Sequence, residues 1–147
     1  MGIASDYVES DDVLVIVWDG QVSGAEWKQN VGERLEDDPA WPRGRRRLID
    51  LTTLDPSAIG VSDIEVVVAF GRERIHHVAG RRQAVVAVLA WDLAQEFARR
   101  STELGATTIV FDRLEPACAW LGVDPAAARP VARELRAALR SDGSAPS

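Results

Sequence analysis

The chain has 147 residues, 46% of them apolar and 27% charged, with a formal net charge of −6, and this length predicts one domain. The negative charge argues against nonspecific nucleic-acid binding, which needs a basic surface, and no apolar run approaches the roughly 18 residues of a membrane helix. The first residues lack the basic and apolar segments of a secretory signal, and the single cysteine, Cys118, excludes an intrachain disulfide, so a cytoplasmic protein is expected.

Strand and helix signals alternate along the chain. Strands are indicated by short β-branched apolar runs, and helices by apolar residues that recur every three to four positions. A capping pattern, Ser or Asp with Glu or Gln three residues later, begins helices at Ser23, Ser62, Asp92 and Asp112. In chain order, the predicted elements are strands at 3–9 and 13–18, a helix at 23–38, a strand at 46–51, a helix at 62–78, a strand at 84–91, a helix at 92–104, a strand at 107–111, a short helix at 112–121, and a last helix.

The last helix is expected to begin at Asp124-Pro125 and to be firm only at 131–140, because Pro130 would break it. Its apolar face, formed by Val131, Leu135 and Leu139, is expected to pack on the same domain rather than on a second subunit.

This order predicts an α/β fold, because strands that alternate with helices form parallel crossovers. We expect a mixed, mostly parallel five-stranded sheet whose N-terminal edge strand is antiparallel. Four main helices and a C-terminal one would flank it.

Acids and hydroxyls follow the strands, whereas arginines precede them. In a parallel sheet the carboxyl ends of the strands share one edge, where ligands and partners usually bind. Helix-end electrostatics explains many single charges, but the density between 50 and 62 exceeds what capping needs. We therefore predict a partner-binding rim at that edge, formed by Asp19, Asp50, Thr52, Asp55, Ser57 and Ser62.

Enzyme signatures are missing from the sequence, so no catalysis, cofactor or metal is expected. Neither a nucleophile elbow nor a phosphate loop occurs, and His76 and His77 belong to the opposite edge from Ser57. A receiver domain would need a lysine after its last strand, but the only lysine is Lys28. Two tryptophans, Trp41 and Trp91, are candidates for lining a ligand cavity.

Several segments resemble the SpoIIAA-like family, relatives of the STAS domains that act as bacterial anti-sigma-factor antagonists. The segments are "WDG", "DPAW", "RRLIDL", "QAVVAVLA" and "VFDRLEPACAWL". The resemblance implies a superhelix of βα units, a fold shared with CRAL-TRIO lipid-transfer domains, and a regulatory or binding role without catalysis. It also implies a SpoIIAA/STAS-like domain at 1–122. Beyond the resemblance, the residues themselves predict a helical extension at 123–140 and a flexible tail at 141–147.

The segment "DPSAIGV" resembles the loop that carries a phosphorylated serine in STAS antagonists. Asp55 matches the acidic position of that loop and Ser57 matches a serine, whereas Pro56 and Ala58 differ from the family pattern. The resemblance implies phosphorylation at Ser57. An ordinary turn serine is the alternative.

Two functions remain open from the sequence. The first is a protein-interaction module whose rim meets a kinase, an anti-sigma factor or a sister subunit, the last giving a homodimer. The second is a carrier or sensor of a small apolar or lipid molecule, held between the helices and the sheet. A cavity behind the helix predicted at 62–78 would distinguish the second function from the first.

Overall fold

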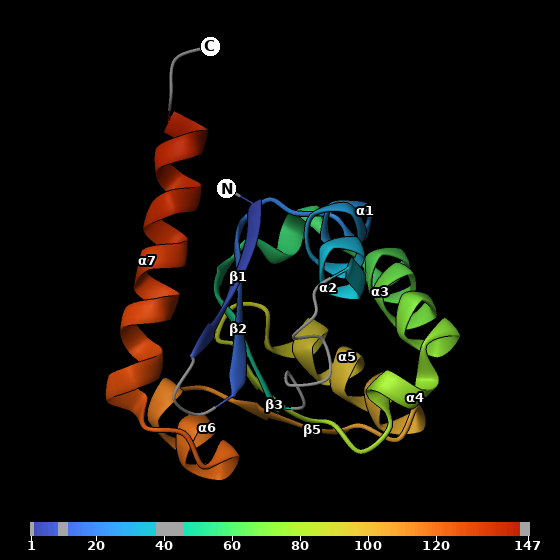
Figure 1. The fold of residues 1–147 in the computed structure, drawn as a ribbon. Coiled ribbons are helices and arrows are strands. Elements are labelled where there is room, and N and C mark those ends of the chain that lie inside the picture. Colours follow the sequence, from blue (N-terminus) through green and yellow to red (C-terminus); the bar gives the residue numbers. More distant parts are fainter. Residues whose placement is uncertain (1, 9–11, 38–45, 145–147) are drawn as a thin grey trace.

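The computed structural model describes residues 2–8, 12–37 and 46–144, and it contains one five-stranded sheet (Figure 1). The strands lie in sequence order, with β1 antiparallel to β2 and all other neighbours parallel. This confirms the predicted mixed α/β sheet. The strands are β1 (Gly2–Val8), β2 (Val13–Gly20), β3 (Arg46–Leu54), β4 (Arg82–Val86) and β5 (Thr107–Phe111).

Helices cover both faces of the sheet. Figure 1 shows the helices that connect the parallel strands on one face, and the last two helices on the other. The connecting segments are α1 (Gly24–Trp27), η1 (Lys28–Gly32), α2 (Glu33–Asp37), the short η3 (Pro56–Ala58), α3 (Val61–Glu73), α4 (Ile75–Val78) and α5 (Trp91–Glu103). The opposite face carries α6 (Leu114–Leu121) and α7 (Pro125–Ser144).

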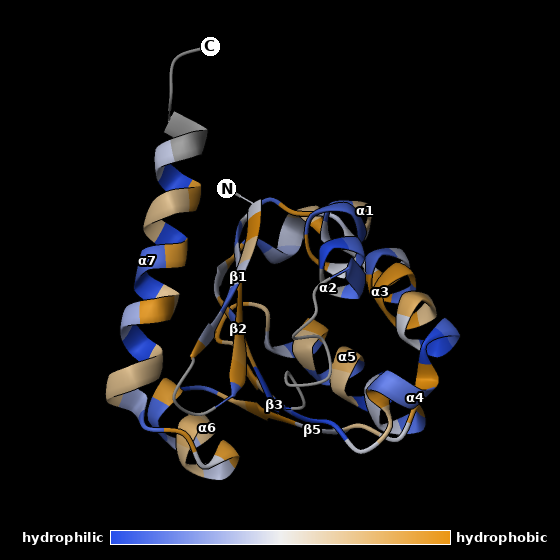
Figure 2. Ribbon diagram, viewed as in Figure 1, coloured by the Kyte–Doolittle hydropathy of each residue, from blue (hydrophilic) through white to orange (hydrophobic). Residues whose placement is uncertain are grey.

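The sheet separates two apolar cores because its central strands are buried on both faces. Side chains alternate along β2, so Leu14 and Ile16 join the core beneath α1, α3 and α5, whereas Val13 and Val15 join the core beneath α6 and α7. Figure 2 shows the continuous apolar colour of β2 between the two helical layers. A nearly unbroken apolar run is typical of such a doubly covered strand.

Of the four predicted helix caps, only Ser23 is confirmed, since its hydroxyl accepts the Glu26 N–H at 3.1 Å. Neither Ser62 nor Asp92 precedes its helix: they are the second residues of α3 and α5. Asp112 lies two residues before α6, which begins after Arg113 without a side-chain cap. The capping motif marked the right regions but the wrong residues.

Asp63 provides the polar contact at the start of α3. Its carboxylate accepts the Gly60 N–H at 2.8 Å and the Gly24 N–H at 3.0 Å, so one side chain joins the beginnings of α1 and α3. A Cβ added at Gly24 would lie 2.4 Å from the Asp63 carbonyl oxygen. Glycine is therefore required where these two helices touch.

Two predicted elements end earlier than expected. The helix predicted at 62–78 is interrupted at Arg74, whose φ of −123° and ψ of 42° are not helical. Ile75, the next residue, is 43% exposed. The strand predicted at 84–91 ends at Val86. The apolar residues Val88 and Leu89 beyond it are 57% and 75% exposed, so an apolar run here continues past the sheet edge.

Helix α7 is longer than predicted and does not break at Pro130. It continues to Ser144, into the segment predicted as a tail. The Asp124 side chain accepts the Ala126 N–H at its start. Buried Ala128 and Ala132, with Val131, Leu135 and Leu139 packed beside them, hold it against its own domain. A proline inside a helix removes one hydrogen bond and crowds the carbonyl four residues earlier. The packing of α7 on the sheet offsets this cost.

Replacement of Asp63 by Ala should lower the free energy of unfolding by about 1–2 kcal/mol, because two backbone N–H groups would lose their acceptor. Ser62→Ala is the matched control and should change it by less than about 0.5 kcal/mol. Urea denaturation of both variants measures the difference. Equal losses, or a larger loss for Ser62→Ala, would contradict this account of the α3 start.

Candidate functional site

The two edges of the sheet carry opposite charges, as predicted. The parallel registers align Arg46 with Arg82 at the amino edge and Asp50 with Val86 at the carboxyl edge. Asp19 pairs with Thr53, also toward the carboxyl edge. Arg45, predicted for the amino edge, lies outside the described residues.

Helix α7 covers part of the predicted partner-binding rim. Arg136 donates to an Asp50 carboxylate oxygen at 2.7 Å and to the Thr53 hydroxyl at 3.0 Å. The other Asp50 oxygen accepts the backbone N–H and hydroxyl of Thr52, at 2.9 Å and 2.6 Å. This half of the rim is therefore engaged by the chain itself.

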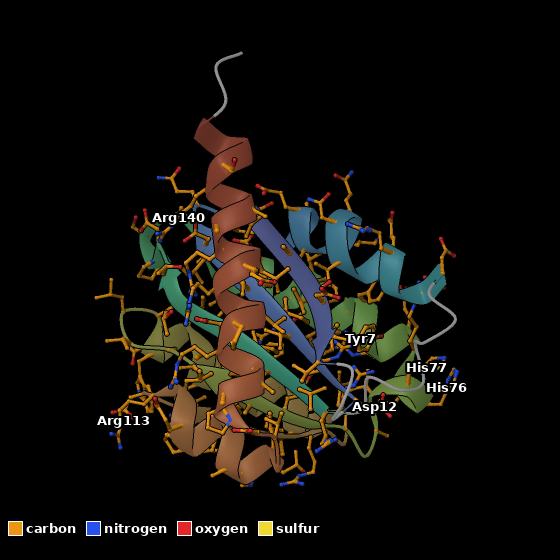
Figure 3. All side chains as sticks on the ribbon, turned by 60° about the vertical axis from the view of Figure 1, so that its left-hand side comes forward. Tyr7, Asp12, His76, His77, Arg113 and Arg140 are labelled. Carbon is orange, nitrogen blue, oxygen red and sulfur yellow. The ribbon has the colours of Figure 1, made fainter. Side chains whose placement is uncertain are left out.

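Asp19 forms a second link with α7. Arg140 donates to its two carboxylate oxygens at 3.2 Å and 3.3 Å. Figure 3 shows Arg140 far from Tyr7 and Asp12, which lie toward the other end of the sheet. Burial by itself would raise the pKa of Asp19. Hydrogen bonds from Arg140 and Thr53 and the positive charge of Arg140 outweigh this effect, so the pKa of Asp19 falls below its ordinary value of 3.8.

The remaining rim residues, Asp55, Ser57 and Ser62, are at or near the surface. The hydroxyl and backbone N–H of Ser57 donate to one oxygen of Asp55 at 2.6 Å and 3.0 Å. These hydrogen bonds, the hydroxyl first, lower the pKa of Asp55. Phosphorylation of Ser57 stays a prediction.

The other face of the sheet contains a cavity between α3, α5 and the strands. Its volume is about 80 Å³, which is more than one water needs. Its walls are mainly apolar and include Trp18, Trp27, Ile49, Val67, Phe70 and Phe97. The cavity lies behind α3, which is where a carrier or sensor of a small apolar molecule was expected to have one.

Charged and polar groups line the same cavity. Arg47 of β3 and Arg81, which directly precedes β4, are only 6% and 5% exposed. The buried Gln83 side chain pairs with Thr108, its amide donating to the hydroxyl at 3.0 Å. Among the described residues that line the cavity, none is acidic.

Burial and charge lower the pKa of both arginines. The pKa of Arg47 falls well below its ordinary value, first because of burial and then because of the nearby positive charge of Arg81. Burial likewise lowers the pKa of Arg81 to about 10. Interaction with Tyr7 of β1 opposes these shifts at both residues. Two cationic groups thus share one mainly apolar space.

Ion pairs on the outside of the cavity connect its helices. Arg100 of α5 pairs with Glu65 of α3 and, at 2.8 Å, with Glu96. Hydrogen bonds from Arg99 and Arg100 lower the pKa of Glu96 to about 2. The Arg74 guanidinium lines the cavity, lies 3.7 Å from the Phe70 ring centroid and pairs with Glu36 of α2 at 2.8 Å.

The tryptophans lining this cavity are not the ones predicted. Trp18 and Trp27 line it, whereas Trp91 is half buried at the first turn of α5 and is not among its lining residues. Trp41 lies outside the described residues. Cys118, a residue of α6, is buried in the core on the face of the sheet that α6 and α7 cover, and burial raises its pKa to about 11.

The buried arginines were missed because the run from Arg43 to Arg47 was interpreted only as charges before a strand. Period-two alternation could have placed Arg47 on the same face as Ile49 and Leu51, which are both buried. No sequence signal separates Arg81 from exposed Arg82, because the two are adjacent and similar.

Comparisons with protein-family models, curated protein sequences and solved structures find no match for this chain. The resemblance to the SpoIIAA-like family thus stays a prediction.

Across the described part of the chain, no helix has the length and apolar character needed to cross a membrane. The same residues contain no cluster of three His, Cys, Asp or Glu side chains placed to hold a metal ion.

Replacing Arg136 with Gln should lower the free energy of unfolding by about 2–3 kcal/mol, because the buried Asp50 carboxylate would lose its cationic partner. Arg133 is an exposed arginine of the same helix, so Arg133→Gln is the matched control and should stay within about 0.5 kcal/mol of wild type. Chemical denaturation compares the two variants. An Arg136→Gln protein as stable as its control would show that the ion pair contributes nothing.

The contribution of Arg140 should depend on pH. Because the folded-state pKa of Asp19 is depressed, the stabilisation is present above the ordinary value of 3.8 and is lost as the pH falls through the lowered value. Arg140→Gln should therefore melt below wild type at pH 7, and the gap should close under strongly acidic conditions. A gap that is constant across this range would contradict the proposed linkage.

Proposed function

We propose that this protein binds a small, largely apolar molecule in the cavity between α3, α5 and the sheet. The observation that carries the proposal is the cavity itself, an apolar space beneath a helix in a domain whose other core is filled by α6 and α7. Ligand sites are commonly concave, mostly apolar and furnished with a few polar groups that orient the ligand. Arg47, Arg81 and Gln83 are such groups here.

The size of the cavity limits the ligand. A volume of about 80 Å³ has room for more than one group of the size of water. This favours a short-chain or single-ring compound over a whole membrane lipid. The proposed activity is reversible binding, either to carry the compound or to sense it.

The walls suggest how the domain responds to a ligand. Helix α3 contributes Val67, Val68 and Phe70 to the lining. Polar contacts join it to its neighbours through Asp63 near Gly24, through Glu65 and Arg100 of α5, and through Arg74, just beyond its end, and Glu36. A ligand beneath its middle would act on α3 directly and could alter the surface around the start of that helix.

A second candidate function is docking of a protein partner at the exposed part of the rim. The observation that favours it is the combination of exposed Ser57 and Ser62 with exposed apolar Val61 and Leu89 at the same carboxyl edge.

The partner function predicts that Ser57→Asp, which adds a negative charge beside Asp55, weakens recovery of a partner in a pull-down from cell extract. Ser57→Ala should behave like wild type, because it adds no charge. Identical recovery by all three proteins would eliminate Ser57 as a switch.

A bulky residue should block the cavity. Val67 lines it, so Val67→Phe should weaken binding of hexanol, a neutral probe, by about tenfold or more as the side chain fills the space. Val66 is half buried on the same helix but is not among the lining residues, and Val66→Phe is the matched control. Titrations followed by NMR chemical shifts measure binding, and thermal melts verify folding.

Failure of hexanol to shift the signals of cavity residues in the wild type would contradict the proposed site. Equal weakening by Val66→Phe and Val67→Phe would show that the probe binds elsewhere.

A further inference from the structure

We infer that two copies of this chain associate through β5, the strand at one edge of the sheet, and form a symmetric dimer with one continuous sheet. The two β5 strands would run antiparallel, and Ile109 of each copy would meet at the two-fold axis. The dimer does not depend on a ligand in the cavity. Three features of this edge support it: its composition, the direction of its backbone groups and the charges at its ends.

The two edges of the sheet are protected to different degrees. At one edge, α7 packs on β1, and β1 carries the exposed Asp6. At the other edge, β5 reads Thr-Thr-Ile-Val-Phe, without a charge, a proline or a glycine. Figure 1 shows β5 along the outer margin of the sheet, and no strand of the described chain pairs with its outer side. Charges on an edge strand oppose pairing with further strands, so β5 is the edge that stays open to it.

The backbone of β5 determines how a second strand can pair with it. In a parallel pair, alternate residues direct both of their backbone groups toward the neighbouring strand. The Thr107 N–H donates to the residue just before β4 at 2.8 Å, and the Phe111 carbonyl accepts from the residue just after β4 at 2.9 Å. Residues 107, 109 and 111 thus face β4. The N–H and carbonyl groups of Thr108 and Val110 point outward.

A two-fold axis at Ile109 would use all of these outward groups. It places Thr108 of each copy opposite Val110 of the other, and each such pair exchanges two backbone hydrogen bonds. Ile109 then meets Ile109 of the second copy as a non-hydrogen-bonded pair, in which the side chains approach closely. Ile109 is 39% exposed, and it is the one large apolar residue of the described strands that is this exposed. The dimer would cover it.

The same register sets opposite charges against each other at both ends of the interface. Arg113, which points away from the fold in Figure 3, would lie opposite Gly105 of the second copy, two residues from Glu103. Both charged side chains are exposed: Glu103 pairs with Arg99 at 3.0 Å, and Arg113 lies 4.0 Å from Asp112. A foreign strand would have to supply both charges, whereas a second copy supplies them by symmetry.

The dependence of mass on concentration tests the dimer. In analytical ultracentrifugation, the wild type should approach twice the chain mass of 16.0 kDa as its concentration rises. Ile109→Lys should weaken the dimer about tenfold or more, because two like charges would meet at the axis. Val61 is another exposed apolar residue, at the start of α3, so Val61→Lys is the matched control and should dimerise like wild type. Melting curves verify that each variant is folded.

A disulfide trap tests the register. Ile109→Cys should give a crosslinked dimer under mild oxidation, because a non-hydrogen-bonded pair holds its two Cα atoms about 4.5 Å apart, within disulfide reach. Thr107→Cys is the control. Thr107 is exposed on the same face of β5, but the register places it opposite Phe111 of the second copy, so it should not crosslink. The native Cys118 is buried and should not react.

The outcomes separate the dimer from the cavity function. A wild type that stays a monomer up to its highest soluble concentration would overturn the dimer and leave the cavity function standing. A dimer that survives Ile109→Lys would refute pairing through β5, and its loss in Val61→Lys would place the interface at the carboxyl edge instead. Equal crosslinking of the two cysteine variants would also refute the proposed pairing. If Ile109→Lys does not fold, the wild-type mass and the crosslinking comparison still decide.

Discussion

The structure depends on a central strand that carries opposite charges on its two buried faces. In β3, Asp50 faces the core beneath α6 and α7, and Arg47 faces the core beneath α3. Burying an ion requires a compensating environment. On one face Arg136 of α7 supplies it. On the other face the Arg47 side chain lines the cavity, so the same strand contributes both to the attachment of the C-terminal helix and to the wall of the proposed ligand site.

Helix α7 changes the interpretation of the carboxyl edge. From the sequence alone, acids and hydroxyls at that edge form one recognition rim. In the structure, α7 divides it into a covered part at Asp19 and Asp50 and an exposed part at Asp55 and Ser57. The charges of the covered part are explained by contacts within the chain. Only the exposed part of the rim is thus available for partner recognition.

The sequence predicted the fold well because periodicity and strand–helix alternation are local signals. It failed where tertiary contacts decide. Asp63, rather than Ser62, caps α3 because its carboxylate also contacts α1. Packing keeps α7 helical through Pro130. The cavity behind α3 was anticipated as a possibility, but the arginines in its lining were not. Arg81 and Arg82 are adjacent and look alike in sequence, and only the alternation of β3 places Arg47 on the face of buried Ile49.

The central claim is that the cavity beneath α3 accepts a small, largely apolar molecule. A crystal structure of the protein grown with hexanol tests it most directly. The account predicts density for hexanol inside the cavity, in contact with Val67 and Phe97. A cavity closed by repacked side chains or filled only by ordered water, with hexanol absent or bound elsewhere, would contradict it.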